Sequence, residues 1–98
     1  MNIFIEKFGS VLTSRQAGKE AYLAFLPTLS EVKKDEQIII DFSNVNAFSP
    51  SWGDEFLTPI HKQYGEQVLL KNILNPSVAL TIKTLEKVNN SKFRISET

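Results

Sequence analysis

The segment that most constrains the fold is IIIDFSNVNAFSPSWGDE at residues 38–55, in which an apolar strand leads through a polar turn into a helix. Residues 38–40 are three consecutive isoleucines, a run typical of a strand buried on both faces in a parallel sheet. Ser49 and Pro50 suit an N-cap and the first helical position, because serine accepts a free backbone N–H and proline has none to lose there. The junction predicts a helix N-terminus at the carboxyl end of a central strand, where open α/β sheets tend to place their functional surface.

Composition narrows the class of protein. The chain of 98 residues suits one domain, spanning residues 1–98. Its 11 basic and 11 acidic residues cancel, which argues against nucleic acid or an anionic membrane as the main partner. The sequence has no cysteine, which excludes disulfides and Cys-ligated zinc and fits a reducing cytoplasm. The first ten residues do not have the pattern of a signal peptide, and no apolar run approaches the ~20 residues that span a bilayer.

Strand and helix signals alternate along the chain. Helices are expected to start near residues 14, 50 and 76, since Thr13 or Ser14, Ser49 and Asn75 are suitable caps. The order predicts an α/β fold: a small, mostly parallel or mixed sheet of about four strands with crossover helices, in which 37–42 is central. The predicted strands cover residues 2–7 at a sheet edge, 11–12, 37–42 and 67–73, with either a short strand or a frayed tail at 92–96.

Apolar residues recur at helical spacing after each cap. Pro27 and Pro59 lie inside the first two patterns and are expected to kink or break those helices, with Thr58-Pro59 as an alternative start of a separate helix. Gly65 is expected to end the second helix. The three apolar stripes are Ala17, Ala21, Ala24, Phe25 and Leu29; then Trp52, Phe56, Ile60 and Tyr64; then Val78, Ile82, Leu85 and either Val88 or Asn89.

The residues offer no catalytic or metal-binding constellation. His61 is the only histidine, has no second ligand at a suitable spacing, and is expected to be exposed on its helix. Asp54 and Glu55 are adjacent, so their side chains diverge by about 100° on a helix and are expected to stabilise the helix N-terminus instead. Ser49 and Ser51 have no general base nearby. We therefore expect no enzyme activity, no metal and no cofactor.

Two side chains near the junction admit more than one role. Trp52 lies on the apolar stripe and is expected in the core, although at a helix start it could instead be an exposed interface anchor. Arg15 opens the first helix and could pair with Asp54 if both helices start at the same rim of the sheet. The four glycines, Gly9, Gly18, Gly53 and Gly65, are scattered and form no phosphate-binding loop.

Over roughly residues 12–88 the chain resembles the STAS domains, a family of bacterial anti-sigma-factor antagonists and transporter tails. The resemblance rests on the apolar strand ending in Asp41-Phe42-Ser43, on Val45 and Phe48, and on the serine-rich helix start. The chain is closer still to a subgroup of small STAS-like proteins of unknown function. That subgroup's motifs are matched by Ser14-Arg15-Gln16-Ala17-Gly18, by Asp41-Phe42-Ser43-Asn44-Val45, by Ser49-Pro50-Ser51-Trp52-Gly53-Asp54-Glu55 and by Lys71-Asn72-Ile73-Leu74-Asn75-Pro76.

The resemblance implies a non-enzymatic regulatory module of bacterial cytoplasmic signalling. STAS antagonists dock a GHKL-type ATPase or kinase through the rim around this helix start, and phosphorylation of a serine there releases the partner. By this resemblance the residues implied in binding are Ser49, Ser51, Trp52, Asp54 and Arg15.

The helix start departs from the antagonists at one position. Theirs reads Asp-Ser-Ser-Gly, and the first serine takes the phosphate. When the chain is aligned on Asp41, that position is Pro50, which has no hydroxyl, and the position before it is Ser49. Only Ser51 matches a serine of the antagonists, so it is the candidate for phosphorylation.

A hypothesis from another class is a small-molecule or anion-binding sensor, with its ligand at the N-terminus of the second helix. A pocket lined by Ser49, Ser51 and backbone amides would favour the sensor. A flat or convex rim with an exposed Trp52 would favour the interaction module. An enzyme is the least supported of the three classes.

Overall fold

The computed structural model describes residues 1–96. The predicted helix starts near residues 14, 50 and 76 are confirmed. In chain order the elements are β1 (Asn2–Phe4), the 3₁₀ helix η1 (Ile5–Phe8), β2 (Val11–Leu12), α1 (Arg15–Leu29), β3 (Ile38–Asp41), β4 (Ala47–Phe48), α2 (Pro50–Tyr64), the 3₁₀ helix η2 (Gly65–Gln67), β5 (Val68–Lys71), α3 (Pro76–Asn89) and β6 (Arg94–Ile95).

Four strands form one sheet in the order β1-β3-β5-β6, and every neighbouring pair is parallel. Ile39 lies between Asn2 of β1 and Leu69 of β5, so β3 is an interior strand, as predicted. β1 forms an edge, as predicted, but it is shorter than expected because the chain turns into η1 after Phe4. The pairing of β6 with β5 confirms the strand alternative for residues 92–96.

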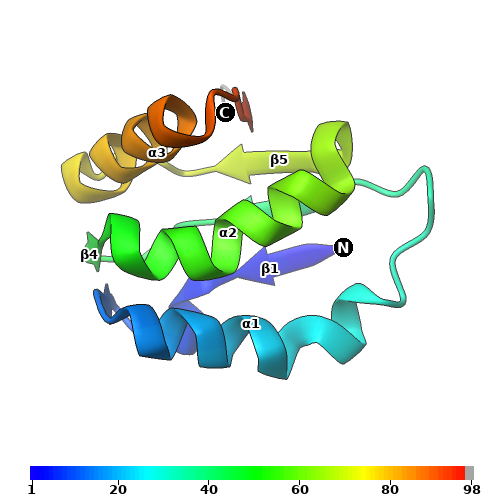
Figure 1. Cartoon of the computed structure of the whole chain (residues 1–98), viewed down its shortest axis with the longest axis horizontal. Helices are drawn as coiled ribbons and strands as arrows, with labels where there is room; N and C mark the ends of the chain where they lie inside the picture. Colours follow the sequence, from blue (N-terminus) through cyan, green and yellow to red (C-terminus); the bar gives the residue numbers. More distant parts are fainter. Residues whose placement is uncertain (97–98) are drawn as a thin grey trace.

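All three helices cover one face of the sheet (Figure 1), with α2 packed between α1 and α3. The strand order advances in one direction, so each right-handed crossover returns its helix to the same side. Side chains of β1, β3 and β5 on that side are buried, whereas Ile39 and Leu69, which point the other way, are only half-buried. The prediction that residues 38–40 are buried on both faces is therefore wrong for Ile39, because no described helix covers the second face. The buried strand residues are Ile3, Ile38, Ile40, Val68 and Leu70.

A second, two-stranded parallel sheet joins β2 to β4. The pattern predicted β2 but not β4, which holds only Ala47 and Phe48. α3 satisfies the backbone of this short strand: the Phe48 N–H donates to Ser77 Oγ at 3.0 Å, and Thr81 Oγ1 donates to the Phe48 carbonyl. These contacts hold the segment that leads into α2 against the start of α3.

Neither interior proline breaks its helix, so that part of the prediction is wrong. Pro27 lies in the last turn of α1, and Pro59 lies within an unbroken α2. Beside Pro59, the side chains of Phe56, Leu57 and Ile60 are all buried. Each such burial contributes about 1.5–3 kcal/mol, which together exceeds the ~3 kcal/mol that a proline costs inside a helix.

The helix ends largely follow the predicted signals. Gly65 ends α2 with a φ of 50°, a conformation that favours glycine.

The predicted apolar stripes are only partly the buried faces of the helices. On α3, of the two alternatives for the last position, the half-buried side chain is Asn89, while Val88 is 72% exposed. On α1 the predicted Ala17 and Ala24 are exposed, and the buried face is made by Gly18, Phe25 and Leu29.

Candidate functional site

Ser49 is the N-cap of α2, as predicted. Its Oγ accepts the Trp52 N–H at 3.2 Å and donates to the Thr13 carbonyl at 2.9 Å. Its own N–H donates to the Leu12 carbonyl at 2.9 Å. One residue thus caps α2 and also ties the start of α2 to the segment that leads into α1.

Gly18 allows the starts of α1 and α2 to meet backbone to backbone. A Cβ atom at residue 18 would lie 2.6 Å from the Trp52 carbonyl oxygen and 3.0 Å from the Trp52 Cα. Gly53 is also confined, because a Cβ there would lie 3.0 Å from both Leu85 and Phe48 side chains. The sequence shows both glycines only as scattered positions, although Gly18 closes the Ser-Arg-x-x-Gly motif.

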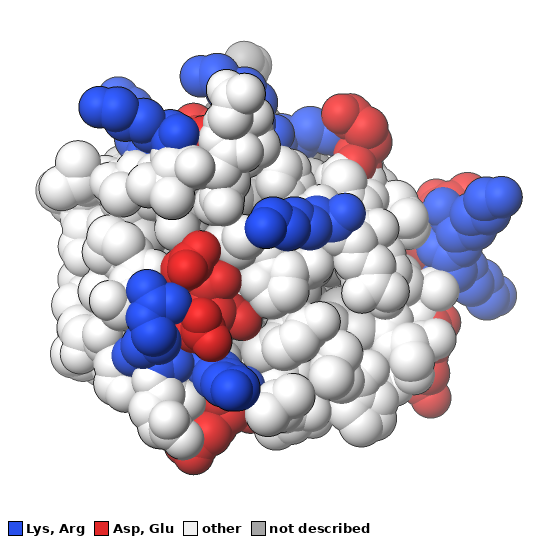
Figure 2. All heavy atoms as spheres, in the orientation of Figure 1, with Lys and Arg blue, Asp and Glu red and all other residues white. Residues whose placement is uncertain are grey.

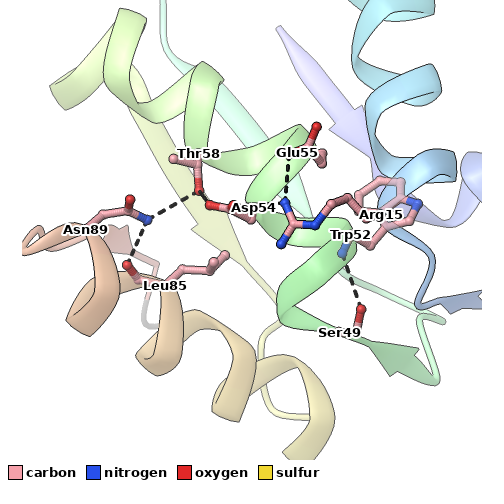
Figure 3. A network of polar contacts seen from close by, with 8 residues as sticks. All are labelled: Arg15, Ser49, Trp52, Asp54, Glu55, Thr58, Leu85 and Asn89. Atoms are coloured by element: carbon pink, nitrogen blue, oxygen red, sulfur yellow. Dashed lines mark hydrogen bonds and ion pairs between the residues drawn. The ribbon is translucent and has the colours of Figure 1, made fainter.

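The predicted pairing of Arg15 with Asp54 is present and also includes Glu55 (Figure 3). Arg15 Nη1 donates to Asp54 Oδ2 at 3.1 Å and to Glu55 Oε2 at 2.8 Å. The hydrogen bond to Asp54, followed by that to Glu55, raises the pKa of Arg15 above its ordinary value. The two carboxylates therefore hold α1 against α2 rather than stabilising the first turn of α2, which contains no acidic residue.

The polar contacts continue from α2 to α3. Asp54 Oδ1 accepts the Thr58 hydroxyl at 3.2 Å, and Asn89 Nδ2 donates both to Thr58 Oγ1 at 3.4 Å and to the Leu85 carbonyl at 3.0 Å. Figure 3 shows this chain of contacts running from Arg15 across α2 to α3. The three helices are therefore linked by polar contacts on their outer side as well as by the core.

Trp52 is a core residue with 1% of its surface exposed. Its ring stacks on Phe56 at 5.0 Å between centroids and meets Phe48 edge-on at 5.8 Å. The core interpretation is confirmed, and the alternative of an exposed interface anchor is wrong. The indole lies beneath the helix start and supports it, but it does not present itself to a partner.

Ser51 stands in the first turn of α2 and is half-buried. Within residues 1–96 its hydroxyl makes no hydrogen bond, in contrast to that of Ser49. A hollow of about 300 Å³ lies near the junction, but neither Ser49 nor Ser51 lines it. This hollow therefore does not provide the pocket that the sensor hypothesis requires. Its lining is mostly apolar: Phe8, Val11, Leu12, Thr13, Ser14, Ala17, Ala21 and Trp52.

Asp41 organises the turn between β3 and β4. Its Oδ1 accepts the Ser43 N–H at 2.9 Å, the Ser43 hydroxyl at 2.7 Å and Asn72 Nδ2 at 2.9 Å. Burial opposes ionisation, but the hydrogen bonds from Asn72 and Ser43, with the nearby charge of Lys71, lower the pKa of Asp41 below its ordinary value. The carboxylate is thus a structural acceptor that joins the ends of β3 and β5.

His61 is half-buried against Phe93, with 4.2 Å between ring centroids, so the expectation of an exposed histidine is wrong. Among residues 1–96, no three His, Cys, Asp or Glu side chains converge where they could hold a metal ion. None of the helices in the described part of the chain combines the length and apolar character that crossing a membrane requires.

Three uncharged segments meet at the end of the molecule where α1, α2 and α3 begin (Figure 1). None of the 11 basic and 11 acidic residues lies in residues 8–14, 42–53 or 72–82. These segments are hydrogen-bonded together: the Asn46 N–H donates to the Ser10 carbonyl at 2.8 Å, and Asn75 Nδ2 donates to the Asn46 carbonyl at 3.3 Å. We call the surface of these segments the uncharged end; in Figure 2 the left flank below α3 is largely white.

The uncharged end exposes aliphatic side chains that the sequence analysis did not single out. Leu74 is 95% exposed, Leu80 67% and Val11 63%. Ser49 and Ser51 lie in the same surface, while Arg15 and Asp54 stand at its border. The absence of charge in three separate segments was the signal in the sequence, but it becomes meaningful only when the fold brings the segments together.

The two serines are expected to differ in their effect on stability. Ser49→Ala removes the cap and the bond to Thr13, and should lower the free energy of unfolding by about 1 kcal/mol. Ser51→Ala removes no side-chain hydrogen bond and should be nearly neutral. Urea unfolding of both variants checks this. Equal loss from the two substitutions would contradict the assignment of the cap to Ser49 alone.

Gly18→Ala is expected to destabilise the protein although alanine favours helices. The new methyl group would meet backbone atoms of Trp52 that cannot rotate away, and such overpacking costs about 1–3 kcal/mol. Replacing glycine by alanine inside a helix stabilises the helix by only about 1 kcal/mol. Urea unfolding of Gly18→Ala, with the exposed Lys19→Ala as control, measures the balance. A more stable Gly18→Ala protein would contradict the close contact.

Comparison with known proteins agrees with this geometry. The model of one protein family, described as STAS-like domain of unknown function (DUF4325), matches residues 16–78. No curated protein and no solved structure matches the chain. The matched segment contains β3, the Asp41 turn, the whole of α2 and β5, and it ends in the first turn of α3. It covers more than half of the sequence, and the chain therefore belongs to the family of STAS-like domains of unknown function.

Proposed function

We propose that this STAS-like domain is a non-enzymatic interaction module whose uncharged end binds a protein partner. The observation that carries the proposal is the exposure of Val11, Leu74 and Leu80 on three segments that contain no charged residue. The Glu6 carboxylate, which accepts a hydrogen bond from Asn44, lies at their border. The centres of protein interfaces are depleted of charged residues and enriched in apolar contacts. Segments without charged residues lose little solvation when a partner covers them, since they carry no ions to desolvate.

The proposed contact residues follow from accessibility. Ser51 can contact a partner through its free hydroxyl, and Arg15 and Asp54 can contribute polar contacts at the border. Ser49 and Trp52 contribute indirectly, because one caps the helix start and the other supports it from below. The proposed interface thus keeps the predicted location but replaces Trp52 by exposed aliphatic side chains.

The proposed partner is a GHKL-type ATPase or kinase, on the strength of the resemblance to STAS antagonists. Their docking rim surrounds the same helix start, and this chain belongs to a STAS-like family. Membership of that family, together with the hydrogen-bonded junction at Asp41 and Ser49, supports a docking role for the same end of the molecule.

The arrangement of potentially reactive groups supports a non-enzymatic role. The one histidine of the chain is packed on Phe93, and the Ser49 hydroxyl is engaged with Thr13 and Trp52. The carboxylates nearest the helix start, Asp54 and Glu55, are both paired with Arg15. No nucleophile and base are therefore paired at this end of the described chain.

Capture from a native lysate with matched bait variants tests the proposal. Leu74→Asp places a charge on the uncharged end at a side chain that is 95% exposed, whereas Val88→Asp places one at an aliphatic side chain that is 72% exposed in the last turn of α3. We expect the unaltered bait and Val88→Asp to retain a GHKL-type ATPase, identified by mass spectrometry, and Leu74→Asp to lose it. The same proteins on all three baits, or no ATPase on any, would contradict the proposal.

We further propose that the partner kinase phosphorylates Ser51 and thereby weakens binding. Transfer of the γ-phosphoryl group from ATP to Ser51 Oγ would release ADP and add about −1.5 to −2 charges to an uncharged interface. Incubation with the captured kinase and ATP should add one phosphate to the intact mass of the chain and none to Ser51→Ala. Persistent absence of that mass shift would contradict control by phosphorylation, and the module would then bind its partner constitutively.

A further inference from the structure

The face of the sheet opposite the helices is an ordered surface of its own. The parallel register places Asn2, Ile39, Leu69 and Arg94 in one row across this face. It places Phe4, Asp41 and Lys71 in the next row. Ile39 and Leu69 stand at the centre of the face and Phe4 is 48% exposed beside them. The face thus has an aliphatic centre with polar and charged residues around it.

A purely parallel sheet with one bare face is unusual. Parallel sheets occur almost only where both faces are covered, because their strands are rich in apolar residues on both sides. The three isoleucines at residues 38–40 give β3 apolar side chains on both faces, as in a sheet covered on both sides. Within residues 1–96, however, helices cover only one face. An apolar centre with a polar rim is also the usual anatomy of a protein interface.

We propose that the occupant of this face is a second copy of the chain, related by a twofold axis that runs parallel to the strands between β3 and β5. Such an axis reverses the strand order and keeps the strand direction. It therefore sets β3 over β5 of the other copy, and β1 over β6. Aligned stacking of two sheets about 10 Å apart is a standard arrangement in β-sandwiches.

The register makes the face complementary to itself under this operation. Ile39 of one copy lies over Leu69 of the other, so the two aliphatic centres meet. In the next row Lys71 lies over Asp41, which is only 8% exposed and whose carboxylate is already bonded to Ser43 and Asn72, so this row sets no like charges against each other. At the margins Asn2 lies over Arg94, so no two like charges of these rows face each other.

The outline of the molecule sets an upper bound on the size of the interface. The molecule measures 31 × 28 Å across the view of Figure 1, in which the strands lie roughly in the plane of the page. The four strands are only two to four residues long, so the face lies well within that outline and is smaller than the roughly 800 Å² that each partner contributes to a standard protein interface. Because the axis preserves strand direction, the two uncharged ends would point the same way and give the dimer two adjacent docking surfaces.

Sedimentation equilibrium of the full chain tests the dimer. At about 100 μM, a concentration that populates a weak dimer, we expect a mass of twice 11.1 kDa. Leu69→Lys should shift the chain to monomer by placing a charge in the aliphatic centre. Asn2→Arg should weaken the dimer at least tenfold by setting two arginines against each other, and it alters only an exposed side chain. Leu23→Lys, at an exposed leucine on α1, is the matched control and should leave the dimer unchanged.

Cross-linking then tests the axis. The chain has no cysteine, so Asn2→Cys and Arg94→Cys variants can each carry a single thiol. A bismaleimide of about 10 Å should join one variant to the other in a mixture, and should join neither to itself. A monomer at 100 μM would overturn the proposal. So would a dimer that survives both Leu69→Lys and Asn2→Arg, or one that cross-links only between identical positions. These outcomes do not depend on partner capture, because the uncharged end takes no part in them.

Discussion

The contact on which the rest of the structure depends is the backbone approach of α1 to α2 at Gly18 and Trp52. Only a residue without a Cβ fits there, at 2.6 Å from a carbonyl oxygen. This closeness brings Arg15 within reach of Asp54 and Glu55 and lets Ser49 bond the segment before α1. The Trp52 ring then fills the space beneath the helix start. The local hydrogen bonds and the aromatic core thus fix the same junction from opposite sides.

The order and type of the main elements could be predicted because their signals are local. The caps at Ser49 and Asn75, each followed by proline, mark helix starts through backbone groups within a few residues. The predictions that failed concern features that depend on residues far away in the sequence. The short strand β4 exists because α3 satisfies its backbone, and α2 continues past Pro59 because its flanking residues are buried. The bare face of β3 likewise depends on the direction in which the strand order advances.

The candidate site shows the same division between local and distant information. The sequence predicted the start of α2 and the pairing of Arg15 with Asp54, since both follow from where two helices start. It could not decide whether Trp52 faces the core or a partner, because both positions suit a tryptophan on an apolar stripe. It also missed Leu74, which has no periodic pattern around it and acquires meaning only beside two other uncharged segments. Burial and surface patches are properties of the assembled fold.

The proposed contact between the uncharged end and its partner is tested most directly by amide chemical shifts in a titration with a captured ATPase. We expect the largest shifts or losses of signal in residues 8–14, 42–53 and 72–82, and we expect Ser51→Asp to reduce them without changing the spectrum of the free fold. Shifts concentrated instead on the bare face of the sheet, at residues 39, 69 and 94, or at the C-terminal ends of the helices would contradict it.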